Sequence, residues 1–331
     1  MPENQSPIMS VGLVAIGRNE GDRLRKCIES VVGRVSKVVY VDSGSTDDSV
    51  TMAKGHGVEI VELDMTHPFT AARARNEGLR KLRQVAPALN YVQFVDGDCE
   101  VVSGWLEKAV LFLNKHREVA VVCGRRRERY PDRSLYNMLC DMEWDTPVGE
   151  ARYCGGDAMM RTNVLEDVGG YREDMIAGEE PELCVRLRRS GWKIWRLGEE
   201  MTLHDAAMTR FGQWWKRNKR AGYAYAQGAY LHGSPPERHG VRQSRSAWMW
   251  GLIIPAIAIV MSLWINAWSL MLLLIYPLQV VRLALRGTRS ANKNWWRALF
   301  LVLGKFPEAE GQVNFLYNRL SGGTAHLIEY K

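Results

Sequence analysis

Short apolar runs alternate with helical patterns through the first hundred residues. The apolar runs, rich in valine and isoleucine, cover residues 11–16, 37–41, 58–63 and 91–95. Segments with helical spacing separate them, at residues 23–32, 50–55 and 70–84. Runs this short between polar turns predict buried strands. Their alternation with helices predicts an α/β domain with a parallel sheet and right-handed crossovers.

The pattern continues in a less regular form beyond residue 100. Residues 103–113 predict an amphipathic helix capped by Ser103, and residues 119–124 predict another buried strand. The arginines at 125–127 follow directly, and we interpret them as a solvated sheet edge, with contact to an acceptor phosphate as the alternative. Pro181 favours a further helix start, and Gly191 its end.

A different pattern begins near residue 246. No charged residue occurs from Ser246 to Val281, which predicts two membrane helices at about 247–265 and 267–285, broken near Asn266. A buried soluble hairpin is the alternative. Cations flank both ends of the pair and place both ends in the cytosol.

Aromatic and basic residues surround this apolar pair. They mix at about 211–230, and a shorter apolar segment covers about 294–304. Both predict helices at a membrane interface, which explains the mixture better than nucleic-acid binding does. The expected division is therefore a catalytic domain at 1–235 and a membrane region at 236–331.

Composition sets wider bounds. The chain has 331 residues, 46% hydrophobic and 24% charged, and a net charge of +7 concentrated after about residue 210. A basic region beside apolar segments suggests anionic membrane lipids as partners, and no nucleic acid. The six cysteines show no CxxC spacing, and the N-terminus lacks a signal-peptide pattern. We therefore expect reduced thiols, no zinc site and no cleaved signal.

Two carboxylates separated by one glycine end the fourth apolar run, as Asp96-Gly97-Asp98. Ligands of open α/β sheets bind outside the carboxyl ends of the strands, so these acids are placed where a ligand would lie. Carboxylates this close repel each other unless a cation lies between them. Oxygen ligands suit Mg²⁺ or Mn²⁺ bridging a diphosphate, and an ordinary acidic turn is the alternative.

Neither the dinucleotide nor the P-loop glycine pattern occurs. Instead, Asp42 ends the second strand and Arg75 lies in the first half of the third helix. A carboxylate can accept from a base or ribose, and an arginine can pair with phosphate or stack on a base. Asp42 could also simply cap a turn. We assign the end of the first strand to the same site, with Ala15, Arg18 and Glu20.

Several of these motifs occur together in a known order. The segment at 38–47, ending in Asp42-Ser43-Gly44-Ser45-Thr46-Asp47, resembles the signature of family 2 glycosyltransferases with the GT-A fold. The segment at 72–78 resembles their second nucleotide motif, and Asp96-Gly97-Asp98 their metal-binding DxD. The resemblance covers about residues 10–210. Ser43 departs from it, because many members carry a second aspartate there.

The resemblance implies a role for each matched residue. Asp42, Arg75 and Gly97 would contact the nucleotide, Asp96 the ribose and metal, and Asp98 would ligate the metal, with His204 as a further ligand. Glu180 takes the position of the family's catalytic base, but it is glutamate where aspartate is usual, which leaves Glu179 as a competitor. Donor or acceptor sugar would contact the following residues: Trp105, Gly155, Gly156 and Asp157.

The expected protein is a metal-dependent, inverting glycosyltransferase that uses a UDP-sugar and needs Mg²⁺ or Mn²⁺. Its acceptor would be a lipid-linked saccharide of exopolysaccharide or cell-envelope synthesis, since similar sequences are common among bacterial exopolysaccharide enzymes. It would be a multi-pass protein of the inner membrane with its catalytic domain in the cytoplasm. The alternatives are a polyprenyl-phosphate glycosyltransferase and a non-catalytic nucleotide-sugar-binding membrane protein.

Overall fold

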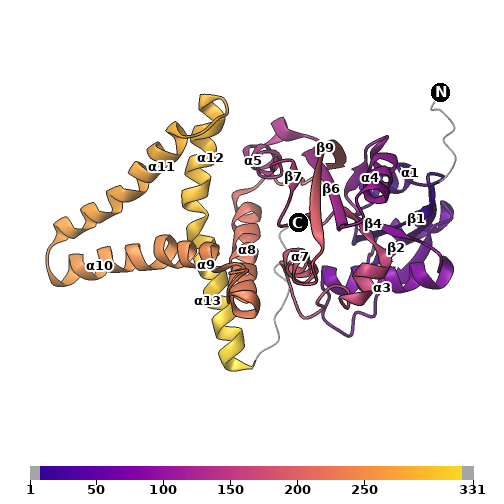
Figure 1. Cartoon of the computed structure of the whole chain (residues 1–331). Helices are drawn as coiled ribbons and strands as arrows, with labels where there is room; N and C mark the ends of the chain where they lie inside the picture. Colours follow the sequence, from indigo (N-terminus) through magenta and orange to yellow (C-terminus); the bar gives the residue numbers. More distant parts are fainter. Residues whose placement is uncertain (1–7, 323–331) are drawn as a thin grey trace. The chain divides into compact units, whose positions relative to one another are not determined.

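The chain forms two compact units, which divide between Ala207 and Met208. The computed structural model describes residues 8–322 (Figure 1). The division lies well before the expected boundary at residue 235. The reason is that helix α8 (Phe211–His232) packs along α13 (Lys305–Ser321) and so belongs to the second unit.

The first unit is built on one mixed sheet with the strand order β3-β2-β1-β4-β8-β6-β9-β5, and β7 pairs with β9. The first four strands are parallel, as predicted: β1 (Ile8–Gly17), β2 (Val35–Asp42), β3 (Glu59–Glu62) and β4 (Tyr91–Asp96). Strand β8 (Ala158–Arg161) is antiparallel to β4 and to β6. The remaining strands are β5 (Cys99–Val101), β6 (Val119–Glu128), β7 (Gly149–Glu150) and β9 (Lys193–His204).

Helices cover both faces of this sheet (Figure 1). The connections through α1 (Asp22–Glu29) and α2 (Ser49–Gly55) run outward from β1, whereas α3 (Ala71–Val85) returns past β1 to β4. Right-handed crossovers therefore place α3 on the opposite face from α1 and α2. The other helices are α4 (Trp105–Lys115), the 3₁₀ turn η1 (Pro131–Arg133), α5 (Leu135–Glu143), α6 (Thr162–Asp167) and α7 (Glu179–Arg189).

The strand order reverses between β1 and β4. From β1 the chain moves outward to β2 and β3, then returns to β4 on the other side of β1. The loops that follow β1 and β4 therefore diverge and leave a crevice at the carboxyl ends of these strands. Asp96-Gly97-Asp98 lies at this edge, as the sequence predicts.

The second unit is helical. A break at Asn266 separates two apolar helices, Val241–Trp264 and Ala267–Leu285, and the Asn266 side chain accepts a hydrogen bond from the Trp268 N–H at 2.8 Å. The break and the end of the second helix are as predicted, whereas the first begins earlier, at Val241. The elements are α9 (Val241–Trp248), the π-helical turn η2 (Met249–Ile253), α10 (Ile254–Trp264), the 3₁₀ helix η3 (Ala267–Leu274), α11 (Ile275–Leu285) and α12 (Ala291–Leu303).

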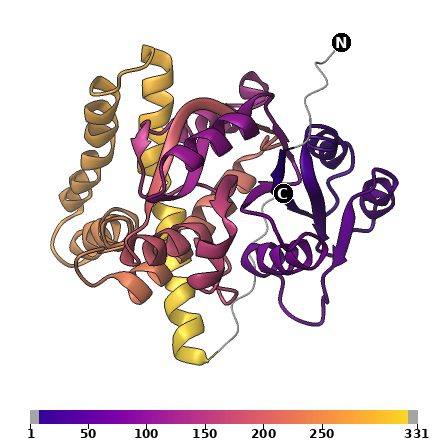
Figure 2. The same cartoon turned by 45° about the vertical axis from the view of Figure 1, so that its right-hand side comes forward.

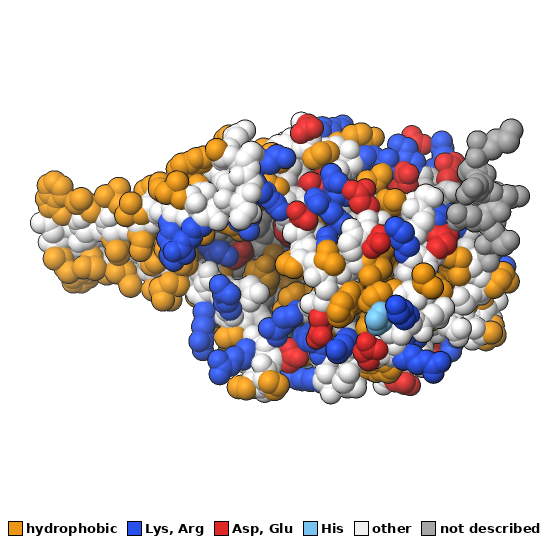
Figure 3. Space-filling view, turned by 45° about the horizontal axis from the view of Figure 1, so that its top comes forward, with side chains coloured by type: hydrophobic (Ala, Val, Ile, Leu, Met, Phe, Trp, Pro, Cys, Tyr) orange, Lys and Arg blue, Asp and Glu red, His pale blue; other side chains and the backbone are white. Residues whose placement is uncertain are grey.

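This apolar hairpin is exposed rather than packed into a core. Its two helices have the length and composition to cross a membrane. Only 11% and 6% of their most apolar 18-residue stretches is buried. Hydrophobic side chains cover its surface (Figure 3). Exposed arginines lie at its ends, among them Arg242 and Arg286. After the hairpin, α12 folds back against α11 (Figure 2).

Two glycines let α8 and α13 approach each other closely. A Cβ at Gly222 would lie 2.0 Å from the Glu308 carbonyl oxygen, and one at Gly311 would lie 1.9 Å from the Lys219 carbonyl oxygen. We expect Gly222→Ala to destabilise the second unit by about 1–3 kcal/mol, because the two backbones must separate. Gly212→Ala on the same helix is the control, since nothing lies within 4 Å of its added Cβ. Thermal unfolding in detergent would measure both, and equal midpoints would contradict the expectation.

Candidate active site

Two loops are joined at the crevice by Asn19. Its backbone N–H donates to Ser45 Oγ at 2.9 Å, and its side-chain Oδ1 accepts from the Thr46 N–H at 2.7 Å. Asn19 has φ +55°, a left-handed conformation that asparagine tolerates better than most residues. The sequence places Asn19 between Arg18 and Glu20 in the loop after the first strand but assigns it no role of its own. Its signal was an asparagine in a loop directly after a strand.

The Asp42 carboxylate accepts four hydrogen bonds, from Tyr40 on β2 and from the turn that follows. Oδ1 accepts from Tyr40 Oη at 2.9 Å and from Ser45 Oγ at 2.5 Å. Oδ2 accepts from the N–H groups of Gly44 and Ser45 at 3.0 and 2.8 Å. A carboxylate has about four acceptor positions. The structure thus shows the turn-capping role, and contact between Asp42 and a nucleotide requires one of these bonds to open.

The other residues assigned to the nucleotide lie at different depths. Arg18 is exposed and Glu20 half-buried on the loop after β1. The Gly97 N–H donates to the Ile16 carbonyl oxygen at 2.8 Å and so holds the acidic turn against β1. Ala15 is fully buried on β1, between β2 and β4.

A buried arginine links two of the predicted carboxylates. Arg75 on α3 donates from Nη1 to Glu179 Oε1 at 2.7 Å and from Nη2 to Asp96 Oδ1 at 2.9 Å. Its guanidinium lies 5.5 Å from the centre of the Tyr171 ring. Burial acts to lower the pKa of Arg75, but the charges of Asp96 and Glu179 outweigh it and raise the pKa above its ordinary value. Arg75 is therefore a fixed cation at the centre of the crevice.

Arg126 is a second cation of this kind, and its assignment to a solvated edge is wrong. Strand β6 continues to Glu128 and pairs with β9, so Arg126 lies inside the sheet. Its Nη2 lies 2.8 Å from Asp157 Oδ1 and 3.5 Å from Asp96 Oδ2. The run of arginines gave no sign of this role. Successive side chains of a strand point to opposite faces of the sheet, and three adjacent arginines do not show which of them faces the carboxylates.

The glycine-rich segment before β8 lines this network. A Cβ at Gly156 would lie 2.9 Å from Arg75 Nη2 and 3.2 Å from Arg126 Nη2, while Gly155 is exposed. Asp157 is fully buried, and it accepts from Thr202 Oγ1 at 2.7 Å. Gly156 therefore faces the crevice, whereas Asp157 supports it from below.

Trp105 does not face the crevice. It is 1% exposed in the core, and its indole Nε1–H donates to Gln93 Oε1 at 2.9 Å. Contact between Trp105 and a sugar is therefore a wrong prediction for this structure. The first turn of α4 points the indole onto the sheet, where its polar N–H finds a buried partner.

Asp98 and His204 lie together although 106 positions separate them, because β5 and β9 pair with Cys99 opposite His204. Asp98 Oδ2 lies 3.3 Å from His204 Nε2, and both side chains are almost wholly buried. On the other side of the ring, Nδ1 lies 3.7 Å from Glu128 Oε2. A carboxylate behind the imidazole is the usual second partner of a metal-binding histidine.

The Glu128 carboxylate is itself held firmly. It accepts from the N–H groups of Tyr130 and Ala206 at 3.1 and 3.0 Å, and from Asn137 Nδ2 at 3.1 Å. Sequence reasoning missed Glu128, which ends β6 beyond the run of arginines. The side chains of Asp98 and His204 fit a divalent cation, because a carboxylate oxygen and the imidazole Nε2 that faces it suit Mn²⁺.

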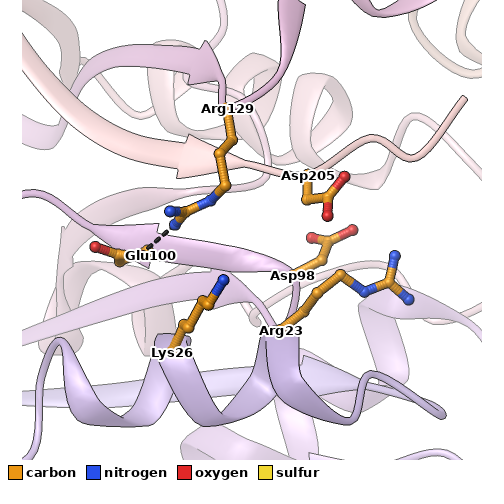
Figure 4. A pocket seen from close by; sticks show the side chains of 6 residues that line it. All are labelled: Arg23, Lys26, Asp98, Glu100, Arg129 and Asp205. Atoms are coloured by element: carbon orange, nitrogen blue, oxygen red, sulfur yellow. Dashed lines mark hydrogen bonds and ion pairs between the residues drawn. The ribbon is translucent and has the colours of Figure 1, made fainter. Parts of the chain in front are cut away.

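Charged side chains surround Asp98 on the side of α1. Figure 4 shows the carboxylates of Asp98 and Asp205 facing each other, with Arg23 beside them. Arg129 forms an ion pair with Glu100 nearby, and Lys26 also lines this small pocket. Cations beside the predicted metal position suit an anionic group such as a diphosphate.

The two candidate bases stand at the N-terminus of α7 in different environments. Glu179 is bound to Arg75, so taking up a proton would cost that ion pair. Glu180 Oε1 accepts from the Cys154 N–H at 2.6 Å and from the thiols of Cys154 and Cys184 at 3.1 Å each. Of the two, Glu180 is the better candidate for a base, because these hydrogen-bond donors are neutral and Glu179 is paired with a cation.

Arg126 offers a test of the network. We expect Arg126→Met to destabilise the first unit by about 3–5 kcal/mol, because it leaves the buried Asp157 without its cation. Arg127→Met on the same strand is the control: its partners Asp141 and Glu200 are more exposed, and about 1 kcal/mol or less is expected. Denaturant unfolding would measure both, and equal costs would show that burial does not set the value of the pair.

Three comparisons bear on this site. Residues 14–169 match the sequence model of Glycosyl transferase family 2. A pre-mycofactocin glycosyltransferase of Mycobacterium tuberculosis is 30% identical over 232 residues, which is 65% of this chain and 46% of the relative, so the chain spans about half of its length. An O-antigen chain rhamnosyltransferase of Salmonella anatum is 24% identical over 51% of this chain and 56% of its own.

The fold also has a solved counterpart. A mannosyltransferase from Pyrobaculum calidifontis, solved with GDP-Man and Mn²⁺, superposes with a TM-score of 0.58 at 18% identity. The match covers 94% of this chain and 88% of that one. At this identity the likeness shows the fold and does not extend to donor or acceptor.

Proposed function

Because the chain belongs to glycosyl transferase family 2 through residues 14–169, we propose that it transfers a sugar from a nucleotide-sugar donor to a membrane-held, lipid-linked saccharide, with inversion at the anomeric carbon. A UDP-sugar is the first donor to test. The observation that carries the proposal is the meeting of Asp98 with His204 beside the Arg75–Asp96 pair, at the carboxyl edge of the parallel strands. These residues lie where open α/β sheets bind ligands.

The metal part of the proposal assigns Asp98 and His204 as ligands of Mg²⁺ or Mn²⁺, with Asp96 beside them. A bound divalent cation stabilises the negative charge on a departing diphosphate. Arg75 keeps Asp96 in place, and Glu128 orients the imidazole of His204. The mannosyltransferase from Pyrobaculum calidifontis was solved in complex with GDP-Man and Mn²⁺, which supports a divalent cation here.

Glu180 is the proposed general base. The acceptor hydroxyl oxygen forms a bond to the anomeric carbon as the bond to the diphosphate oxygen breaks, and the hydroxyl proton passes to the Glu180 carboxylate. The hydrogen bond from the Cys154 N–H fixes that carboxylate at the start of α7. A polyprenyl-phosphate glycosyltransferase, the alternative, would attack with a phosphate oxygen and need no such base.

The membrane part rests on the hairpin of the second unit. Two exposed apolar helices of sufficient length support insertion, and a lipid-linked acceptor gives a reason for the anchor. The relative that acts on O-antigen chains supports a cell-envelope glycan as the product class. Arginines at both ends of the hairpin favour a cytoplasmic catalytic unit at the inner membrane. Reporters fused after Gly240 and after Gly287 should both be cytosolic, and opposite sides would mean a single span.

A donor screen tests the activity. The detergent-purified chain would be given each nucleotide sugar with Mn²⁺ or Mg²⁺, with and without a membrane lipid extract, while release of nucleoside diphosphate is followed. We expect release that rises with the extract and stops with EDTA. Release that ignores EDTA would contradict the metal assignment. Donor binding without any turnover would favour the non-catalytic alternative.

A further inference from the structure

Thiols gather around the proposed base. Cys154, in the segment before β8, and Cys184, on α7, have their sulfur atoms 3.7 Å apart. Each sulfur lies 3.1 Å from Glu180 Oε1, and all three side chains are buried. A third buried thiol, Cys123 on β6, is near: burial raises its pKa, and the charge of Glu180 raises it further.

The spacing of these atoms matches a metal site. In a tetrahedral zinc site with Zn–S bonds of about 2.3 Å, two sulfurs lie about 3.8 Å apart and a sulfur and an oxygen about 3.5 Å apart. The sulfur pair here has the first spacing, and the sulfur–oxygen pairs are within about 0.4 Å of the second. We propose that Cys154, Cys184 and Glu180 form a binding site for a thiophilic divalent cation such as Zn²⁺.

The charge balance of the site agrees with this ligand class. Both thiols donate hydrogen bonds to Glu180 Oε1, so each sulfur carries its proton in this arrangement. A cation that binds there replaces two thiol protons, which leave to solvent, and no oxidant or reductant is required. Two thiolates and one carboxylate then surround one doubly charged ion. Sulfur ligands select Zn²⁺ over the Mg²⁺ or Mn²⁺ proposed for Asp98 and His204.

The site lies just below the surface. The neighbours of Cys154 in the chain, Arg152, Tyr153 and Gly155, are all exposed. This segment has little regular secondary structure between β7 and β8, so a small cation has a short path to the sulfurs. The spacing of cysteines in the sequence gives no sign of the site, because 29 residues separate Cys154 from Cys184 and only the fold brings them together.

Occupation of the site would have a functional consequence, which rests on the proposed function. The cation takes Glu180 Oε1 as a ligand, and that carboxylate is then not available to accept a proton from the acceptor. We therefore expect Zn²⁺ to inhibit transfer even when Mn²⁺ is in excess. Cation binding itself depends only on the three ligands.

The binding test uses Cd²⁺, whose bonds to thiolates give an ultraviolet charge-transfer band. The reduced, chelator-treated full chain in detergent should bind one equivalent per chain with this band, without donor or acceptor. Cys154→Ala and Cys184→Ala should each weaken binding at least tenfold. Cys140→Ala, a buried cysteine on α5 outside the cluster, is the matched control and should retain the band. A band lost with Cys99→Ala but kept in the first two variants would overturn the proposal.

A measurement on the unsubstituted chain covers variants that fail to fold. X-ray absorption at the zinc edge, with one equivalent of Zn²⁺, should show two or three sulfur ligands and at least one oxygen or nitrogen. One sulfur or none would overturn the proposal. These readouts need no turnover, so a chain that binds Cd²⁺ but transfers no sugar would contradict the proposed function and leave the cation site intact.

Discussion

Replacing Asp98 by asparagine is expected to lower kcat by about 10²–10⁴-fold, because it removes the carboxylate proposed to hold the divalent cation that stabilises the diphosphate. The loss should appear as nucleoside diphosphate release that no longer responds to Mn²⁺. Binding of Mn²⁺ to the apoprotein, followed by calorimetry, should weaken in parallel. The fold should survive, since asparagine has nearly the same shape.

Asp205→Asn is the matched comparison, because the Asp205 carboxylate faces Asp98 in the same pocket (Figure 4). It lies one residue beyond His204 and is not assigned as a ligand, so a smaller loss of Mn²⁺ affinity is expected. If Asp205→Asn abolished Mn²⁺ binding while Asp98→Asn preserved it, the ligand assignment would pass to Asp205.

Glu180→Gln should reduce kcat by about 10²–10⁴-fold while donor affinity changes little. The amide keeps the length of the side chain and can still accept the hydrogen bond from the Cys154 N–H, but it cannot take up a proton. Donor titration calorimetry alongside turnover separates these effects. Transfer at the rate of the unsubstituted enzyme would refute the assignment of Glu180 as the base.

Glu179→Gln provides the contrast on the same helical turn. Glu179 pairs with Arg75 at 2.7 Å, so its loss should disturb the crevice and weaken donor binding more than it slows the chemical step. Glu180→Gln should therefore lower kcat with little change in KM, whereas Glu179→Gln should mainly raise KM. If Glu179→Gln instead lowered kcat alone, the roles of the two glutamates would be reversed.

Much of the fold could be predicted from local pattern. The four parallel strands, their helices and the break at Asn266 follow from apolar period and turn residues, because each strand between helices has one right-handed way to pack. The antiparallel strand β8 carries no comparable signal. Its four residues, Ala158–Arg161, join the sheet by pairing with β4 and β6, which are distant in sequence.

The sequence likewise identified some of the site residues and misplaced others. Asp96, Asp98 and Arg75 stood out because polar groups at the ends of apolar strands or beside glycines need a reason to be there. Trp105 was misplaced because an aromatic residue after a turn has the same local pattern whether it faces the core or a sugar. Arg126 was misplaced because its partner Asp157 is 31 positions away.

The sequence by itself determined that strands and helices alternate through the first hundred residues in a parallel sheet, and where polar groups leave the strands, since both depend on short-range period and on chain chirality. Only the tertiary structure decided which polar groups meet. The partnership of Asp98 with His204, the pairing of Glu179 with Arg75 and the placement of two thiols against Glu180 all join distant segments. The physical reason is that such contacts depend on the register of strands and on which face a side chain takes, and these are set by packing of the whole sheet.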